Sequence, residues 1–145
     1  MKKLAGCLAL FFISPSFLPA QQLQNAPAAV VAAFQSKYPT VRKVSWEKDG
    51  KAYAARFHDR DESCTARFSE KGEWLDAVRK INFGELRNNV RNALSQGQYA
   101  TWRAYEVNEI IERNKEPRYR IRVRSSDDQS ERYLFYDAKG QVLTM

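Results

Sequence analysis

The segment near the end of the chain at residues 118–124 has the residue types best suited to binding. It reads Arg-Tyr-Arg-Ile-Arg-Val-Arg, with an arginine at every second position. Alternate side chains of a β-strand point to the same face, so the four arginines would share one face and the other residues the opposite face. The row therefore predicts one sheet face that is lined with arginine side chains.

The next segment, residues 131–136, would place aromatic side chains beside these arginines. If the two strands form a hairpin, Leu134 and Tyr136 point inward, while Tyr133 and Phe135 point outward. Arginine combined with exposed aromatic residues is typical of protein-binding hot spots. The candidate partner-binding residues are Arg120, Arg122, Tyr133, Phe135, Arg56 and Arg67, the last two at the matching outer positions earlier in the chain.

Acidic residues near the same strands support a different interpretation. If these residues pair with the arginines, each cross-strand ion pair would contribute about 0.2–1 kcal/mol. An arginine row also protects a sheet from aggregation. The acidic residues in question are Glu106, Glu109, Glu112 and Glu131. A face neutralised in this way would favour a structural or stress-related protein without a defined ligand.

Sequence motifs for catalysis are absent: the chain has no H-E-x-x-H, G-x-S-x-G, phosphate-binding loop or C-x-x-C. The single histidine, His58, has no second imidazole to help it and is expected at the surface. Acidic turns at residues 59–62 and 126–128 lack the spacing of a calcium loop. We therefore expect no enzyme activity, no cofactor and no metal site. A small-ligand or metal sensor is a further alternative.

The overall composition is that of a globular protein. The chain has 145 residues, of which 43% are hydrophobic and 28% charged, and this excludes disordered, collagen-like and coiled-coil classes. The net charge is +7, of which Lys2 and Lys3 supply two. The remaining +5 is spread evenly, because residues 26–81 carry 11 basic and 8 acidic side chains and residues 82–145 carry 11 and 9. No one-sided basic domain results, so nucleic acid is not an expected partner.

The first twenty residues have the pattern of an export signal. Two lysines precede an apolar run at residues 4–13, and prolines and small residues follow up to Ala20. The run is shorter than the roughly 20 apolar residues of a membrane span. We predict a signal peptide at residues 1–20, cleaved after Ala20, and a periplasmic or secreted protein without an integral membrane span.

Two cysteines bear on this prediction. Residues 4–7 match the lipoprotein consensus, but the apolar run continues behind Cys7, so lipidation is not expected. After cleavage Cys64 is the only cysteine, and an exported chain with one cysteine forms no internal disulfide. Its alternating surroundings predict a buried, small, hydrophobic side chain.

The remaining chain reads as two copies of one unit. Residues 68–75 (FSEKGEWL) and 136–143 (YDAKGQVL) share an aromatic residue, polar residues with Lys-Gly, and two final apolar residues. Both patterns predict hairpins in which glycine takes the positive φ. An alternating strand precedes each hairpin, at residues 53–57 and 119–123, and another strand lies before that, with Val44 and Trp46 or with Tyr105 and Val107.

A helix is predicted at the start of each copy. The apolar residues recur three and four positions apart, with Pro39 and Gly97 as helix ends. These apolar residues are Val30, Val31, Phe34 and Tyr38 in the first copy and Phe83, Leu86, Val90 and Leu94 in the second. The predicted fold is α+β, with repeats at residues 21–81 and 82–145. Each repeat is one helix plus a four-stranded antiparallel sheet, with helices on one face and the other face open.

These segments resemble the PepSY-like family, small secreted proteins of Gram-negative bacteria also described as beta-lactamase-inhibitor-like. The resemblance rests on Lys-Tyr-Pro at residues 37–39, VSWEKDG at residues 44–50 and the first hairpin, which departs from the usual F-D-A-D-G-K-W-L at residues 69–71. It implies export, two repeats and no catalysis. The expected partner is a protein or peptide of the envelope, and inhibition of an envelope enzyme is one form that such binding could take.

Overall fold

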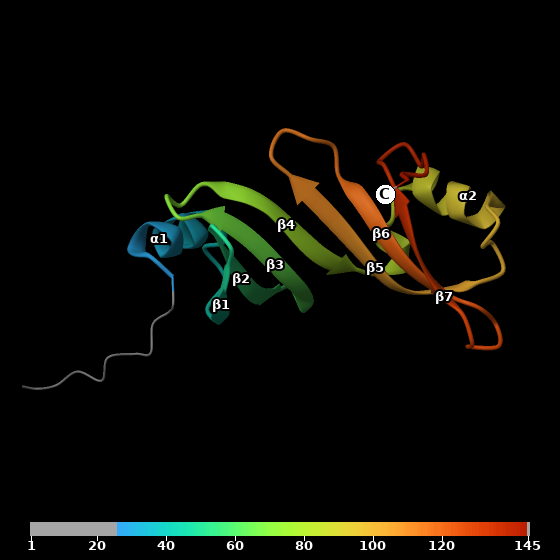
Figure 1. The fold of residues 1–145 in the computed structure, drawn as a ribbon, viewed down its shortest axis with the longest axis horizontal. Coiled ribbons are helices and arrows are strands. Elements are labelled where there is room, and N and C mark those ends of the chain that lie inside the picture. The colour runs from blue at the N-terminus through green and yellow to red at the C-terminus, as the bar shows by residue number, and fades with distance from the viewer. Residues whose placement is uncertain (1–25, 145) are drawn as a thin grey trace, which may run out of the picture.

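The computed structural model describes residues 26–144, so the predicted signal peptide and its cleavage site lie outside the described residues. Figure 1 shows a long, curved sheet with α1 near one end and α2 near the other. The elements are α1 (Ala28–Lys37), β1 (Val44–Asp49), β2 (Ala52–Asp59), β3 (Glu62–Ser69), β4 (Trp74–Ile81), the 3₁₀ helix η1 (Phe83–Glu85), α2 (Asn88–Gln96), β5 (Arg103–Glu112), β6 (Arg118–Arg124) and β7 (Glu131–Tyr136).

One seven-stranded antiparallel sheet joins the two repeats. Its strand order is β1-β2-β3-β4-β5-β6-β7, so every strand pairs with its neighbours in sequence. The junction is the β4–β5 pairing, which runs from Asp76 opposite Glu112 to Ile81 opposite Val107. The sheets of the two repeats are therefore continuous.

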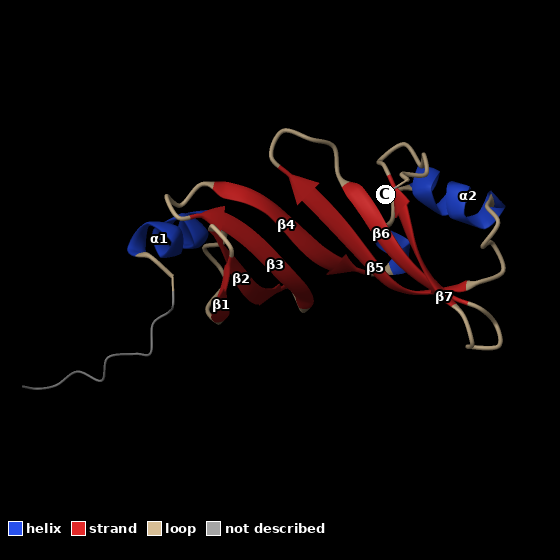
Figure 2. Cartoon of the chain, in the orientation of Figure 1, coloured by secondary structure: helices blue, strands red, loops and turns tan. Residues whose placement is uncertain are grey.

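The two helices cover the same face of this sheet, which we call the inner face (Figure 2). In α1, Val30 and Phe34 lie one helical turn apart and are buried, as are Val90 and Leu94 in α2. Each pair packs on its own hydrophobic cluster. Strand β4 supplies Ala77 to the first cluster and Ile81 to the second, and residues four apart in a strand share a face. The opposite, outer face carries no helix within residues 26–144.

A glycine turn contacts the helix in each repeat. Gly72 and Gly140 both have a φ of +84°. A Cβ on Gly72 would lie 2.6 Å from the carbonyl oxygen of Ala29, and one on Gly140 would lie 2.5 Å from that of Asn89. Each turn thus needs glycine for its backbone conformation and for its close approach to the helix. The two turns therefore make the same kind of contact with their helices.

The prediction of a fourth strand in the second repeat is wrong. The hairpin turn forms, but beyond it only one isolated bridge is present, between Tyr136 and Val142. The segment lies beside the last strand of the sheet and has no further strand to pair with, and Val142 is 69% exposed. The architecture is therefore two helices on a seven-stranded sheet rather than two complete four-stranded units.

The second predicted helix also begins later than its apolar spacing indicates. Phe83 belongs to η1 and is 44% exposed, whereas α2 starts at Asn88. A capping box begins η1, because the backbone N–H of Asn82 donates to the Glu85 carboxylate at 2.9 Å. Leu86 and Arg87 then have extended backbones, with ψ of 140° and 143°, and they separate η1 from α2. Leu86 is still buried against the second cluster.

Candidate protein-binding face

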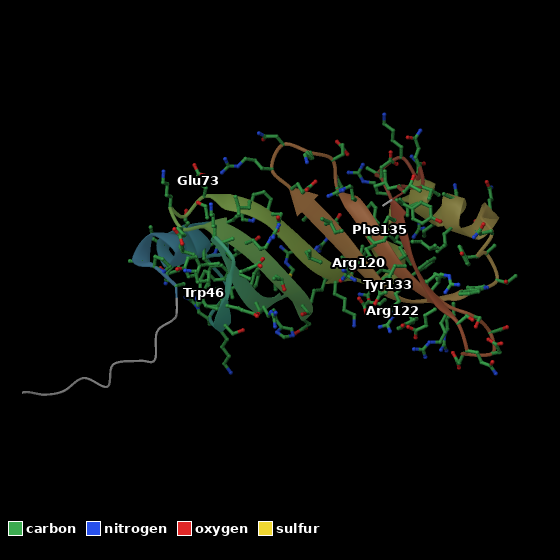
Figure 3. All side chains as sticks on the ribbon, viewed as in Figure 1. Trp46, Glu73, Arg120, Arg122, Tyr133 and Phe135 are labelled. Atoms are coloured by element: carbon green, nitrogen blue, oxygen red, sulfur yellow. The ribbon has the colours of Figure 1, made fainter. Side chains whose placement is uncertain are left out.

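The outer face of β5, β6 and β7 brings the predicted arginines and aromatic residues together. Arg120 lies directly opposite Phe135, and Arg122 lies directly opposite Tyr133. Tyr119, Ile121 and Val123, between the arginines, are buried on the inner face. We call the outer surface the arginine–aromatic face; it consists of Tyr105, Arg118, Arg120, Arg122, Arg124, Tyr133 and Phe135. Figure 3 shows the labelled members over β6 and β7, away from Trp46 and Glu73 of the first repeat.

Guanidinium groups and tyrosine rings alternate across this face. Arg120 and Arg122 lie over the Tyr133 ring, with the guanidinium carbon 5.8 and 5.5 Å from its centroid. Arg122 and Arg124 lie over the Tyr105 ring, at 4.8 and 4.5 Å. Each cation–π contact at an exposed site contributes about 0.5–1 kcal/mol. The contacts hold the long arginine side chains in place, so less conformational entropy is lost when a partner binds.

Glu131 is the main carboxylate partner within this face. It accepts hydrogen bonds from the Nη2 of Arg122 at 2.6 Å and from the Nε of Arg124 at 2.8 Å. The hydrogen bond from Arg122 is the largest cause that lowers the pKa of Glu131 to about 2. Glu131 therefore stays ionised at neutral pH and neutralises much of the charge at this end of the row.

The arginines nearer the sheet junction differ in how well they are paired. The Nη2 of Arg118 lies 3.0 Å from Glu112. The Nη2 of Arg120 lies 3.9 Å from Glu106, which is too far for a hydrogen bond. That carboxylate also lies 3.8 Å from Arg122 and accepts from the amide of Asn108 at 2.8 Å. Arg120 is thus the least neutralised arginine of the face.

A pocket of about 380 Å³ opens beside Arg120. Residues from four separate parts of the chain line it: Ile110, Arg118, Arg120, Phe135, Leu143 and Thr144. The C-terminal segment closes one side, because the backbone N–H of Leu143 donates to the carbonyl of Phe135 at 2.8 Å. The arrangement offers an apolar hollow with positive charge along one wall.

Arg56 and Arg67 lie on the same outer face but in the first repeat. They sit on β2 and β3, separated from β6 by β4 and β5. Each has its own acidic partners: Arg56 contacts Glu47, and Arg67 contacts Asp49 and Asp76. The structure therefore does not bring them into the arginine–aromatic face.

The sequence analysis did not predict two features of this face. The sequence predicted a strand with Tyr105 and Val107, which share a face in a regular strand, but the register of β5 against β6 shifts between Ala104 and Glu106. This β-bulge turns Tyr105 toward Arg122 and Arg124. The pocket was also missed, since its lining residues meet only in the folded chain. Of the four glutamates proposed as pairs, Glu109 points to the inner face and contacts Arg79.

His58 and Cys64 lie on β2 and β3, away from the arginine–aromatic face. His58 is exposed, and Cys64 is buried at 6% exposure, where burial raises the pKa of its thiol. No group of three histidine, cysteine or acidic side chains within residues 26–144 is placed to hold a metal ion. No helix in the same range has the length and apolar character needed to cross a membrane.

Solved structures from Bacteroides species have the same fold. A proposed periplasmic protein from Bacteroides eggerthii is 23% identical, with a TM-score of 0.78 over 83% of this chain and 88% of that chain. A DUF2874 family protein from Bacteroides ovatus is 24% identical, with a TM-score of 0.76 over 83% and 86%. A BLIP-like protein from Bacteroides fragilis is 19% identical, with a TM-score of 0.73 over 85% and 86%.

These similarities establish a BLIP-like fold for the chain and no more, because the identities are low. No protein-family model matches the sequence. No curated protein matches it either. The beta-lactamase-inhibitor-like part of the predicted resemblance is thus confirmed as a fold, and the PepSY-like part stays a prediction.

Proposed function

We propose that this chain is a PepSY-like, non-catalytic module of the cell envelope, periplasmic or secreted, that binds a protein or peptide. The arginine–aromatic face is the binding surface, with Arg120, Arg122, Tyr133 and Phe135 as its main contacts. Arg56 and Arg67 would assist only a partner large enough to reach the first repeat. The fold shared with a proposed periplasmic protein and a BLIP-like protein supports this proposal, as does the export pattern of residues 1–20.

One observation carries the proposal: Tyr133 is 51% exposed and lies between two arginines on a sheet face that no helix covers in the described range. Tyrosine and arginine dominate the binding energy of protein interfaces. Here their side chains are already held in place by one another, which lowers the entropic cost of binding.

The repeat itself provides the test variant. Aligning the repeats by their strands and hairpins places Ala54, Thr65 and Arg67 where the second repeat has Arg120, Tyr133 and Phe135. The variant Arg120→Ala/Tyr133→Thr/Phe135→Arg therefore gives these three positions the residues of the first repeat. It leaves the net charge unchanged, so non-specific electrostatic binding stays the same.

The experiment is affinity capture from the envelope fraction of the source bacterium, with the chain from Gln21 as bait. We expect a partner that binds the wild type and binds the variant at least about 30-fold more weakly, as loss of hot-spot residues requires. The control, Arg42→Ala/Phe83→Arg, exchanges the same residue types at exposed positions outside the face and should bind like the wild type. A partner held equally by all three proteins would show that this face is not the site.

The second candidate is a structural or stress-related envelope protein without a ligand. The ion pairs favour it, because five arginines of the outer face each have a carboxylate within 3.0 Å: Arg56, Arg67, Arg118, Arg122 and Arg124. Under this alternative, capture finds no specific partner, and the triple variant differs from the wild type only in stability or solubility.

A further inference from the structure

The pocket beside Arg120 combines two kinds of wall. Ile110, Phe135 and Leu143 are half-buried and present apolar surface to the hollow, whereas Arg118 and Arg120 present guanidinium groups. Its volume of about 380 Å³ lies within the range of ligand pockets, roughly 300–1,000 Å³. An apolar side chain with a neighbouring polar group would therefore fit it better than a purely polar or purely apolar one.

The guanidinium of Arg120 lacks the partners that such a group normally has. Its Nε is buried and has no hydrogen-bond partner among residues 26–144, and its closest carboxylate is 3.9 Å away. The side chain is nevertheless 39% exposed, so a ligand can reach it. A buried donor without a partner is costly. The Nη2 of Arg120 is also too far from Glu106 for a hydrogen bond, so a carboxylate from outside would add a charge-assisted hydrogen bond that this guanidinium lacks.

We propose that the partner contacts this pocket with an acidic side chain adjacent to an aromatic or large aliphatic one. The carboxylate binds Arg120, with Arg118 beside it, and the apolar side chain packs against Ile110, Phe135 and Leu143. This inference rests on the proposed function and specifies the partner's chemistry. Charge complementarity supports the acidic residue, because four carboxylates (Glu106, Glu112, Asp128 and Glu131) are shared by six basic side chains (Arg103, Lys115, Arg118, Arg120, Arg122 and Arg124).

The N-terminal part of the chain does not meet this requirement. Residues 1–25 contain no aspartate or glutamate, so no side chain of that segment can supply the carboxylate.

The test uses capped dipeptides as probes of the pocket. Acetyl-Glu-Phe-amide and acetyl-Phe-Glu-amide present the acid in both orders, and the corresponding Gln dipeptides lack only the charge. Each is titrated into the isotopically labelled chain from Gln21, and amide NMR signals are followed. We expect a Kd on the order of 1–10 mM for one acidic dipeptide, with shifts at Phe135 and Leu143, whose backbones are hydrogen-bonded to each other.

The charge dependence tests the role of Arg120. The Gln dipeptides should bind about tenfold more weakly, as expected for loss of a charge-assisted hydrogen bond. Arg120→Gln should abolish the preference for the acidic dipeptide, whereas Arg42→Gln, at an exposed loop position, should keep it. Both variants should show the cooperative thermal unfolding transition of the wild type, which tests that they are folded.

Equal binding of the acidic and neutral dipeptides would overturn the inference, as would shifts confined to other residues or no shifts at all. The proposed function is tested separately, because affinity capture from the envelope fraction does not assume that the partner is acidic. A captured partner that the triple variant loses, together with dipeptides that show no preference, would leave the function standing and refute only the acidic motif.

Discussion

Alanine substitutions at three glycine turns should distinguish two contributions to stability: the positive φ of the turn and its close contact with a helix. Gly50, Gly72 and Gly140 all have positive φ, of +60°, +84° and +84°, and alanine in this conformation costs about 1–2 kcal/mol. A Cβ at Gly50 would have nothing within 4 Å, whereas those at Gly72 and Gly140 would lie 2.6 and 2.5 Å from helix carbonyl oxygens. Relieving such overlap by moving the helix costs about a further 1–3 kcal/mol.

The free energy of unfolding should therefore fall by about 1 kcal/mol in Gly50→Ala and by about 3 kcal/mol in Gly72→Ala and Gly140→Ala. Urea denaturation followed by circular dichroism measures these values, and each 1 kcal/mol should lower the Tm by roughly 4 °C. Gly84→Ala is the control, since its Cβ meets nothing and its φ is not positive. If Gly72→Ala and Gly140→Ala lose no more than Gly50→Ala, the turns are not held against the helices and our account of the repeat is wrong.

Three other predictions concern the first core, the acidic partner of the arginines and the free thiol. Phe34→Ala should lower the free energy of unfolding by about 3–5 kcal/mol in urea, because the ring contacts four aromatic side chains. The pKa of Glu131 is lowered from 4.5 to about 2, so its stabilisation is complete above about pH 4.5 and lost as the pH falls toward 2. Glu131→Gln should flatten the pH profile of the Tm in that window, and an unchanged profile would contradict the assignment. Cys64, buried with a raised pKa, should react with iodoacetamide far more slowly in the folded chain than in urea.

Features set by local sequence were predictable. Alternation alone placed Tyr119, Ile121 and Val123 inside and the arginines outside, because strand periodicity is two and one face is buried. The turns at Gly72 and Gly140 were predictable for the same reason, since the required backbone conformation favours glycine.

Features that depend on distant pairing were not predictable. The bulge that exposes Tyr105 to the arginines arises where β5 pairs with β6, and nothing within residues 103–112 alone marks it. The segment after Gly140 forms no eighth strand. It lies at the end of the sheet and makes a single bridge, to Tyr136. The pocket beside Arg120 is formed by residues 110, 118, 120, 135, 143 and 144, which meet only through the strand order.

A comparison of the two repeats shows which residues the fold requires and which positions tolerate different residues. Both repeats pack one helix on the inner face and hold a glycine turn against it. On the outer face the first repeat folds with Ala54 and Thr65 where the second has Arg120 and Tyr133. Folding therefore does not demand an arginine or an aromatic ring at these positions. Exposed aromatic residues and an incompletely paired guanidinium reduce solubility and stability, so a binding role explains their presence in the second repeat better than folding does.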